Sequence, residues 1–244
     1  MCGLADVGSS LRGQGQQQLG SWSLHWSGAA EDTPAQHWQP SVGLLLSNQA
    51  ATALTDIQCL GPRLLKARFA GSTSLTLLVC YAPTSQYPEQ QAEFFAQLAE
   101  AASTVPKREA LLVLGDFNSR VGTASRSDPY HGCCLGNFGA GERNASGEQL
   151  LQVCSELGLC VANSYFQHKA AHTYTWLNPS GRSTPVIDYI LTRPGSLNSL
   201  QDVRVHRHGN LLAPAAGSIS DHHLLVGTLQ LKLKGRSRQQ RQPR

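Results

Sequence analysis

The tetrapeptide Gly115-Asp116-Phe117-Asn118 constrains the fold most, because it places polar groups directly after an apolar run. That run, residues 110–114 (Ala-Leu-Leu-Val-Leu), predicts a fully buried strand. Gly115 allows a turn at the strand end, since a residue without Cβ tolerates positive φ. In an extended chain Asp116 and Asn118 would point the same way, offering a carboxylate for a hard cation and an amide donor for a phosphate. The alternative is an Asx turn that caps the strand.

Two later segments also place polar side chains against apolar strands. Asp188 lies within residues 185–191 (Pro-Val-Ile-Asp-Tyr-Ile-Leu), where an ionised carboxylate is costly unless it is paired or hydrogen-bonded. Residues 220–223 (Ser-Asp-His-His) run straight into the apolar residues 224–229. Taken singly, Asp188 has the alternative of a buried hydrogen-bonded acid, and His222 that of a loop histidine.

Four motifs in this order resemble those of the endonuclease/exonuclease/phosphatase superfamily: Tyr81-Ala82-Pro83, Gly115-Asp116-Phe117-Asn118, Ile187-Asp188-Tyr189 and Ser220-Asp221-His222. Within it, the sequence is most similar to the endonuclease domain of non-LTR (LINE-type) retrotransposons and to host proteins derived from it. The likeness runs from about Leu4 to Leu231. It implies an α/β fold: a two-sheet α/β sandwich of the DNase I-like type, with the active site where strand-end loops of both sheets meet.

The resemblance also implies a chemistry, the hydrolysis of a phosphodiester in DNA assisted by Mg²⁺, with Mn²⁺ as an alternative. His222 would be the general base or electrophilic partner at the scissile phosphate. Asp188 would orient its imidazole, fixing the tautomer and raising the basicity. Asp116 would act on the attacking water or the leaving group. The remaining implied roles are a phosphate donor (Asn118), a hydroxyl that holds the phosphate (Tyr81) and a support for the metal (Asp221).

The N-terminus departs from the family pattern. The resemblance implies a first strand bearing an Asn, a helix, and a second strand whose closing Glu binds the metal. Residues 1–7 (Met-Cys-Gly-Leu-Ala-Asp-Val) align with that second strand, so Asp6 falls at the metal-binding Glu, and we expect the first strand and helix to be missing. Asp is one methylene shorter, which moves the carboxylate by about 1.5 Å. The alternative for Asp6 is a solvated residue near a frayed terminus, and an exposed sheet edge would favour self-association.

Charge is distributed unevenly along the chain. The net charge is +4, yet six basic residues and no acid lie between Lys232 and Arg244, which leaves the rest at −2. We therefore expect one domain over residues 1–231 and a basic disordered tail over 232–244. Arg236 and Arg238 of the tail would contact nucleic acid, the alternative being a solvated tail. Trp176 would stack or wedge at a minor groove, with a core or hairpin aromatic as the alternative.

The seven cysteines show no CxxC spacing, and their odd number without a signal peptide fits a reducing compartment. We therefore expect an intracellular protein, nuclear or cytoplasmic and not secreted. No segment approaches the roughly twenty apolar residues of a membrane span. Helices are predicted from Pro88, with Phe94, Phe95 and Leu98 on the core face, and over residues 147–157, ended by Gly158. Residues 121–143 read as a long loop near the site.

Two classes of function remain open at the level of sequence. The first is an enzyme, a Mg²⁺-dependent DNA endonuclease of retrotransposon origin that uses the residues named above. The second is a truncated or exapted protein without catalysis, which binds nucleic acid or another protein if it acts at all. The incomplete N-terminal motif supports the second class, because displacement of one positioning group commonly costs orders of magnitude in rate.

Overall fold

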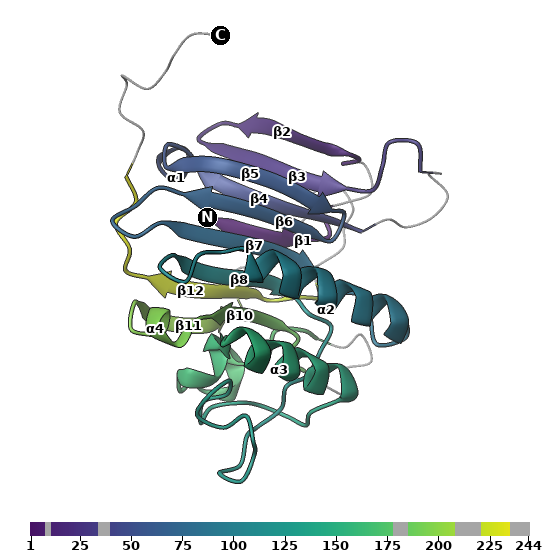
Figure 1. Cartoon of the computed structure of the whole chain (residues 1–244), viewed down its shortest axis with the longest axis vertical. Helices are drawn as coiled ribbons and strands as arrows, with labels where there is room; N and C mark the ends of the chain where they lie inside the picture. The colour runs from purple at the N-terminus through teal and green to yellow at the C-terminus, as the bar shows by residue number, and fades with distance from the viewer. Residues whose placement is uncertain (8–10, 34–39, 178–184, 208–220, 235–244) are drawn as a thin grey trace. The chain divides into compact units, whose positions relative to one another are not determined.

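The computed structural model describes residues 1–7, 11–33, 40–177, 185–207 and 221–234 of the chain (Figure 1). The chain forms two compact units. The first contains Met1–Tyr81, Glu100–Gly115 and Leu231–Arg244, and the second contains Ala82–Ala99 and Asp116–Gln230. Each unit is described by itself below.

An antiparallel sheet begins the first unit. Its strand order is β1-β4-β3-β2, so β1 lies at one edge and pairs with β4. Alternate side chains of β4 are apolar, and Val42, Leu44 and Leu46 are fully buried, as expected where one face of a sheet covers a core. The strands are β1 (Cys2–Ala5), β2 (Gln14–Leu19), β3 (Trp22–Gly28) and β4 (Ser41–Ser47).

A second row of strands, in the order β5-β6-β7-β8, packs against this sheet. Strands β1 and β4 contact β7, and β3 contacts β5, so the first unit is a two-layer sandwich. The predicted sandwich is therefore confirmed, and so is the predicted strand before Asp116. The strands of this row are β5 (Leu54–Gly61), β6 (Leu64–Phe69), β7 (Leu75–Tyr81) and β8 (Ala110–Asp116).

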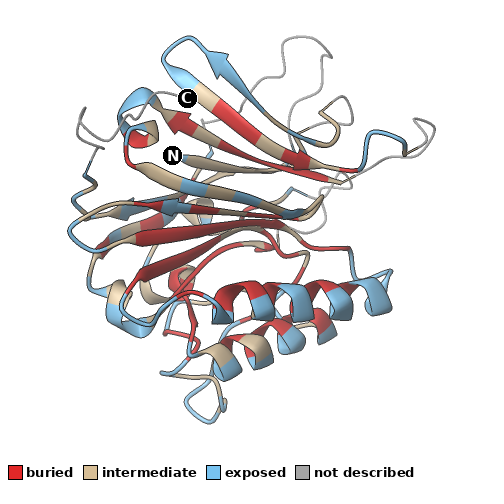
Figure 2. Ribbon diagram, turned by 45° about the horizontal axis from the view of Figure 1, so that its top comes forward, coloured by how far each residue is buried: buried red, intermediate tan, exposed pale blue. Residues whose placement is uncertain are grey.

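Both predicted helices form, and each buries one side and exposes the other (Figure 2). Helix α2 (Pro88–Ser103) has Phe94, Phe95 and Leu98 on its buried face. Helix α3 (Ala145–Leu157) begins two residues earlier than predicted, because Asn144 Oδ1 accepts a hydrogen bond from the backbone N–H of Gly147 and caps it. Gly158 ends α3 with a left-handed φ of 62°. A short helix, α1 (Asn48–Ala51), follows β4.

The second unit contains two strand pairs, β9 with β10 and β11 with β12, both antiparallel. The outer residues of β11 alternate with Leu200, Val203 and Val205, which are buried. The elements are η1 (Ala162–Tyr165) and η2 (Ala170–His172), both 3₁₀ helices, with β9 (Cys160–Val161), β10 (Asp188–Thr192), α4 (Pro194–Leu197), β11 (Leu200–His206) and β12 (Leu224–Leu229).

The predicted loop over residues 121–143 has no helix or strand of its own beyond an isolated bridge. Arg143 holds its ends together. The Arg143 guanidinium donates to Val121 O and to Glu148 on α3, both at 3.0 Å, and also pairs with Asp128. This network ties a long polar segment to a helix, which keeps the loop ordered.

The chain beyond β12 returns to the first unit. Lys232 O accepts from Ser72 N at 2.9 Å, and Lys234 N donates to Ala70 O at 3.0 Å. The predicted basic tail thus starts with residues that bond to the first unit, while Arg236 and Arg238 lie outside the described residues. No helix in the described part of the chain is long and apolar enough to cross a membrane.

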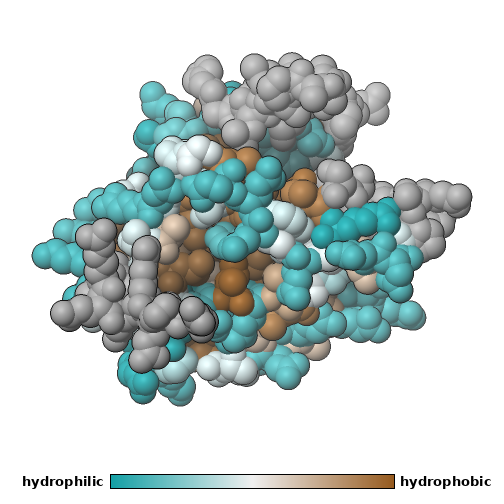
Figure 3. Space-filling model, turned by 90° about the horizontal axis from the view of Figure 1, so that it is seen from above, coloured by the Kyte–Doolittle hydropathy of each residue, from teal (hydrophilic) through white to brown (hydrophobic). Residues whose placement is uncertain are grey.

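Exposed hydrophobic side chains occur on both strands of the β2–β3 hairpin, where Leu19 and Trp22 are more than two fifths exposed. Figure 3 shows hydrophobic side chains gathered in the middle of one face, with hydrophilic ones around them. Self-association stays a prediction.

Candidate functional site

The turn after β8 brings Asp116 and Asn118 close together, but not as two side chains on one extended face. Gly115 has φ 152°, and a Cβ there would lie 1.9 Å from Cys80 O. Asn118 has φ 46°, and its N–H donates to Asp116 Oδ1 at 2.8 Å, which is the Asx turn considered above. The Asn118 amide donates to Ala82 O at 2.8 Å. The extended geometry predicted for these residues is therefore wrong; one amide hydrogen of Asn118 is already engaged, and its role at a phosphate stays a prediction.

Asp188, the first residue of β10, is held from both sides through its backbone. Its N–H donates to Thr175 Oγ1 at 3.1 Å, and the neighbouring Ile187 N–H donates to the same oxygen at 3.0 Å. Asn163 Nδ2 donates to Asp188 O at 3.1 Å, while Asn163 Oδ1 accepts from Ile190 N at 3.0 Å. These buried bonds fix where the Asp188 carboxylate projects.

His222 lies between two carboxylates. Its Nδ1 is 3.0 Å from Asp188 Oδ2 and 3.3 Å from Oδ1, and its Nε2 is 3.9 Å from Asp116 Oδ2. Because a carboxylate only accepts, Nδ1 carries a hydrogen when it bonds Asp188. The backbone on both sides is anchored: Leu177 N donates to Asp221 O at 2.8 Å, and His223 N donates to Thr175 O at 2.7 Å.

The electrostatics of this cluster favour retained protons. Burial and the negative charge of Asp188 raise the pKa of Asp116 to about 7, against the charge of His222 and the N–H of Asn118. Burial of His222 opposes its charged form. The hydrogen bond and charge of Asp188, with the charges of Asp116 and Asp221, outweigh that effect and raise the pKa of His222 to about 9. The shift of Asp116 places its titration near neutral pH, where acid–base catalysts work, and the shift of His222 keeps its ring protonated there.

Trp176 and Asp221 form a direct pair beside His222. The indole Nε1–H donates to Asp221 Oδ2 at 2.8 Å. The Trp176 ring centroid is 6.4 Å from that of His222, with the planes at 51°. One carboxylate oxygen of Asp221, the residue predicted to support the metal, therefore accepts a hydrogen bond from Trp176, the residue predicted to contact nucleic acid. Both roles stay predictions.

The structure places Asp6 and Tyr81 in the first unit, while the other candidate residues that it describes lie in the second. Asp6 follows β1 with a left-handed φ of 56°, and its N–H donates to Ser41 O at 2.8 Å. The Arg63 guanidinium lies 5.5 Å from the centroid of the Tyr81 ring and donates to Tyr81 O at 3.2 Å. Burial lowers the pKa of Arg63, and the charges of Tyr81 and Asp6 oppose this. The side chains of Asp6 and Tyr81 are thus both close enough to Arg63 to influence its charge.

Among the described residues, one group could hold a metal ion: ligand atoms of Asp116, Asp188 and His222 all lie within 4.8 Å of one another. Two carboxylates suit a hard cation such as Mg²⁺, which proteins bind through one or two carboxylates and water. The donor set therefore fits a divalent ion. The predicted ligands Asp6 and Asp221 are not members of this group.

Sequence reasoning missed the supports of the site. Thr175 is fully buried and accepts two backbone N–H groups beside Asp188, and Asn163 braces the same strand. Arg63 was likewise not assigned a role. The available signal was position, since Thr175 directly precedes Trp176.

The profile of the endonuclease/exonuclease/phosphatase family matches residues 21–222. The chain belongs to this family. Craniofacial development protein 2 from Bos taurus is 30% identical over 228 residues, a match that covers 88% of this chain and 36% of that protein. The chain thus spans less than two fifths of the length of this curated relative.

Solved structures of the family have the same fold. The 3'-5' exonuclease NExo from Neisseria meningitidis has a TM-score of 0.58 at 20% identity, covering 86% of this chain and 80% of NExo. A second NExo structure, with a TM-score of 0.54, contains a product DNA hairpin; it is 20% identical and covers 86% of this chain and 79% of that one. The endonuclease domain of TRAS1, a telomere-specific non-LTR retrotransposon, has a TM-score of 0.54 at 17% identity, with coverage of 85% and 80%.

Proposed function

We propose that this protein is a Mg²⁺-dependent phosphodiester hydrolase that cuts DNA, of the type found in non-LTR retrotransposons. The observation that carries the proposal is the position of His222, 3.0 Å from Asp188 and 3.9 Å from Asp116. A histidine with carboxylates at both ring nitrogens can hold or pass a proton in a fixed direction. Family membership and the NExo structure with DNA support the choice of substrate.

The pKa values favour a division of labour. A pKa of about 9 keeps His222 protonated at neutral pH, so its Nε2–H is the electrophile and proton donor toward the phosphate. Asp116, whose pKa is raised to about 7 by burial and by the charge of Asp188, would act on the attacking water or the leaving group. Asp188, bonded to Nδ1, orients the imidazole and stabilises its charge.

Asp116 and Asp188 would hold the divalent ion, Mg²⁺ or alternatively Mn²⁺. When bound, the ion supplies charge neutralisation at the phosphate and activation of water. The chain itself supplies the orientation, because Thr175 and Asn163 fix the backbone of Asp188 and the Asx turn fixes Asp116.

The second candidate function is a nuclease-like protein that binds nucleic acid or protein without catalysis. Two observations favour it. Asp6 stands where the family resemblance implies a metal-binding Glu, and it is outside the group that could hold a metal. The amide of Asn118 is engaged by Ala82 O rather than held free for a phosphate.

A plasmid-nicking assay distinguishes the two. The full chain is incubated with supercoiled DNA in Mg²⁺ and in EDTA, beside the variants His222→Ala and His131→Ala. His131 is the matched control, since it is a histidine of the same unit bonded to Asn137. We expect nicking that needs Mg²⁺ and falls by about 100-fold or more in His222→Ala but not in His131→Ala. Folded protein that does not nick, or nicks equally without His222, would contradict the proposal.

Titration calorimetry with MgCl₂ tests the metal site directly. We expect Asp116→Asn to weaken Mg²⁺ binding by about 10-fold or more, because it removes a charged oxygen ligand. The variant Asp6→Ala tests whether Asp6 is a metal ligand. Loss of Mg²⁺ binding in this variant would support Asp6 as a ligand, and unchanged Mg²⁺ binding would exclude that role.

A further inference from the structure

The outer face of β11 and the neighbouring η2 segment concentrate positive charge. Asp202, Arg204 and His206 alternate with buried valines, so they share the outer face of the strand, and the exposed Arg207 follows it. The exposed Lys169 precedes η2, which contacts β11. We call this set the β11 strip. Its cations are Lys169, Arg204 and Arg207, and beside them lie His168, His172 and His206, whose Nε2 accepts a hydrogen bond from Arg204 Nε at 3.2 Å.

The single acid of the strip is already paired. Asp202 is the only acid in residues 166–174 and 200–207. His168 Nε2 lies 2.8 Å from Asp202 Oδ1, and Arg204 Nε lies 3.7 Å from Oδ2. These two segments therefore carry three permanent cations (Lys169, Arg204 and Arg207) and one carboxylate, whereas residues 1–231 as a whole are net negative. This concentration of positive charge makes the strip an electrostatic feature of its own.

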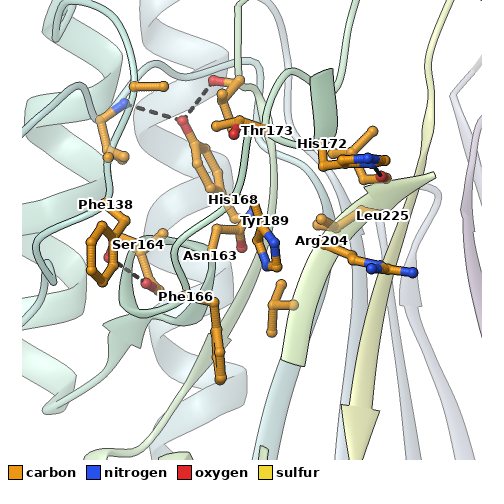
Figure 4. Close-up of a pocket in the computed structure, with 17 residues that line it drawn as sticks. Phe138, Asn163, Ser164, Phe166, His168, His172, Thr173, Tyr189, Arg204 and Leu225 are labelled. Atoms are coloured by element: carbon orange, nitrogen blue, oxygen red, sulfur yellow. Dashed lines mark hydrogen bonds between the residues drawn. The ribbon is translucent and has the colours of Figure 1, made fainter. Parts of the chain in front are cut away.

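Neighbouring contacts hold the strip in shape. His172 Nδ1 lies 3.0 Å from Val205 O, and because a carbonyl only accepts, this nitrogen carries the hydrogen. His168, His172 and Arg204 are among the residues that line a small cavity of this unit. Figure 4 shows the Arg204 guanidinium pointing away from this cavity, with His168 and His172 beside it. The charge is thus presented outward while the rings pack behind it.

The strip leads to the candidate active site within the same unit. His206 pairs with Leu224, two residues after His222. Arg207 directly follows His206, so it lies at the end of β11 that pairs with Leu224. The positive charge therefore extends from Lys169 to the edge of the catalytic cluster.

The spacing suits a polyanion. Side chains two residues apart on a strand are separated by about 6.6 Å, and a nucleic acid strand offers one phosphate per 3.4 Å of axial rise. Arginine binds phosphate oxygens through a planar fork, and such contacts position a duplex without reading its sequence. We propose that the β11 strip binds the phosphate backbone of duplex DNA and leads it to His222. The choice of DNA as the polyanion rests on the proposed function.

The test measures binding without cleavage, by fluorescence anisotropy of a labelled duplex in EDTA across a range of salt concentrations. We expect Arg204→Gln/Arg207→Gln to flatten the slope of log Kd against log salt by about 1.8, or about 0.9 for each lost phosphate contact. The matched control is Arg126→Gln, an exposed cation in the loop of the same unit, and we expect it to leave the slope unchanged. Arg204→Lys/Arg207→Lys keeps the charge and should restore most of the slope.

A variant of opposite sign completes the design. Asp202→Asn removes the only acid of the strip and should tighten binding. No duplex binding by the wild-type chain at low salt, an unchanged slope in the double Gln variant, or an equal loss in Arg126→Gln would each overturn the proposal. The binding test does not depend on cleavage, so the two proposals can fail separately. DNA binding through the strip without nicking would refute the proposed function and support the strip. Nicking with an unchanged salt slope in the double Gln variant would support the proposed function and refute the strip.

Discussion

Two His–Asp pairs in the second unit differ in what lies around them. In the first pair, His222 Nδ1 is 3.0 Å from Asp188, and Asp116 lies 3.9 Å from the other ring nitrogen. In the second, His168 Nε2 is 2.8 Å from Asp202, and the additional neighbour is Arg204, on the carboxylate side. In the first pair one histidine thus lies beside two carboxylates, and in the second one carboxylate lies beside a histidine and an arginine. Because both sites contain a His–Asp contact, the additional neighbour determines how they differ chemically.

Beside His222, the second carboxylate (Asp116) can hold a proton or a cation. Beside Asp202, the additional Arg204 adds positive charge to the surface. Around His222, burial and negative charge raise the pKa of Asp116 to about 7, and the hydrogen bond and charge of Asp188 raise that of His222 to about 9, so both groups hold their protons more strongly than the free side chains do. Around Asp202, the acid pairs with His168 and lies 3.7 Å from Arg204, while Lys169 and Arg207 are exposed. The comparison teaches that a short His–Asp contact alone does not identify a catalytic centre.

The largest effect should separate the two aspartates. Asp188→Asn removes the charge that orients and stabilises His222, and we expect kcat for nicking to fall by about 100-fold to 10,000-fold. Asp202→Asn should change the apparent affinity for DNA, in the tighter direction, and not produce such a loss of kcat. Single-turnover nicking with excess enzyme measures both. Similar losses of kcat in both variants would erase the distinction between the pairs.

The proton held by the first pair should appear as a pH dependence of stability in EDTA. The pKa of His222 is raised from 6.5 to about 9, so its contribution is fully present below pH 6.5 and is lost as pH rises through 9. The pKa of Asp116 is raised from 3.8 to about 7, so its protonated form likewise favours folding and is lost as pH rises through 7. We expect the free energy of unfolding to fall across this range, by on the order of 2 kcal/mol.

Urea unfolding between pH 5 and 9 measures this decrease. Asp188→Asn is the control, since it removes the main partner that holds the proton on His222. The decrease above pH 6.5 should become shallower in that variant. Stability that rises with pH in the wild-type protein would reverse the sign of the argument.

The smallest expected effect concerns Trp176, the aromatic neighbour of His222 in the first pair. Trp176→Phe keeps a ring beside His222 but removes the N–H that Asp221 accepts. Because Asp221 is exposed, we expect a loss of about 0.5–1 kcal/mol in stability or in transition-state binding. Trp176→Ala should cost more, since the ring is lost as well. If the Phe and Ala variants are equally impaired in kcat/KM, the hydrogen bond matters and the ring does not.

The sequence predicted both main helices and the strand before Asp116 from local patterns, because an apolar run defines the strand and Gly158 ends α3. The sandwich followed from the family resemblance, which the order of the polar motifs indicates and the family match confirms. Family resemblance implied the contact between Asp188 and His222, residues 34 positions apart, which spacing alone does not predict.

The features that the sequence could not predict depend on backbone dihedral angles, on individual hydrogen bonds and on which strands pair. Asn118 adopts a left-handed φ, so the extended geometry assumed for it fails. Thr175 supports Asp188 only because two backbone N–H groups happen to converge on its hydroxyl. The β11 strip needs the pairing of β11 with β12 and the contact with η2, and neither is written in the local pattern. Counting charges along the chain assigned most of the positive potential to the tail.

Gly115 carries a consequence for any saturation library of this gene. With Cys80 O only 1.9 Å from the place of a Cβ, every other amino acid would force β8 away from β7. A screen for soluble protein should therefore reject all nineteen replacements at position 115, while it should accept many at positions 188 and 222. A screen for DNA cutting should reject replacements at all three. The difference between the two screens would separate the residues that build the site from those that use it.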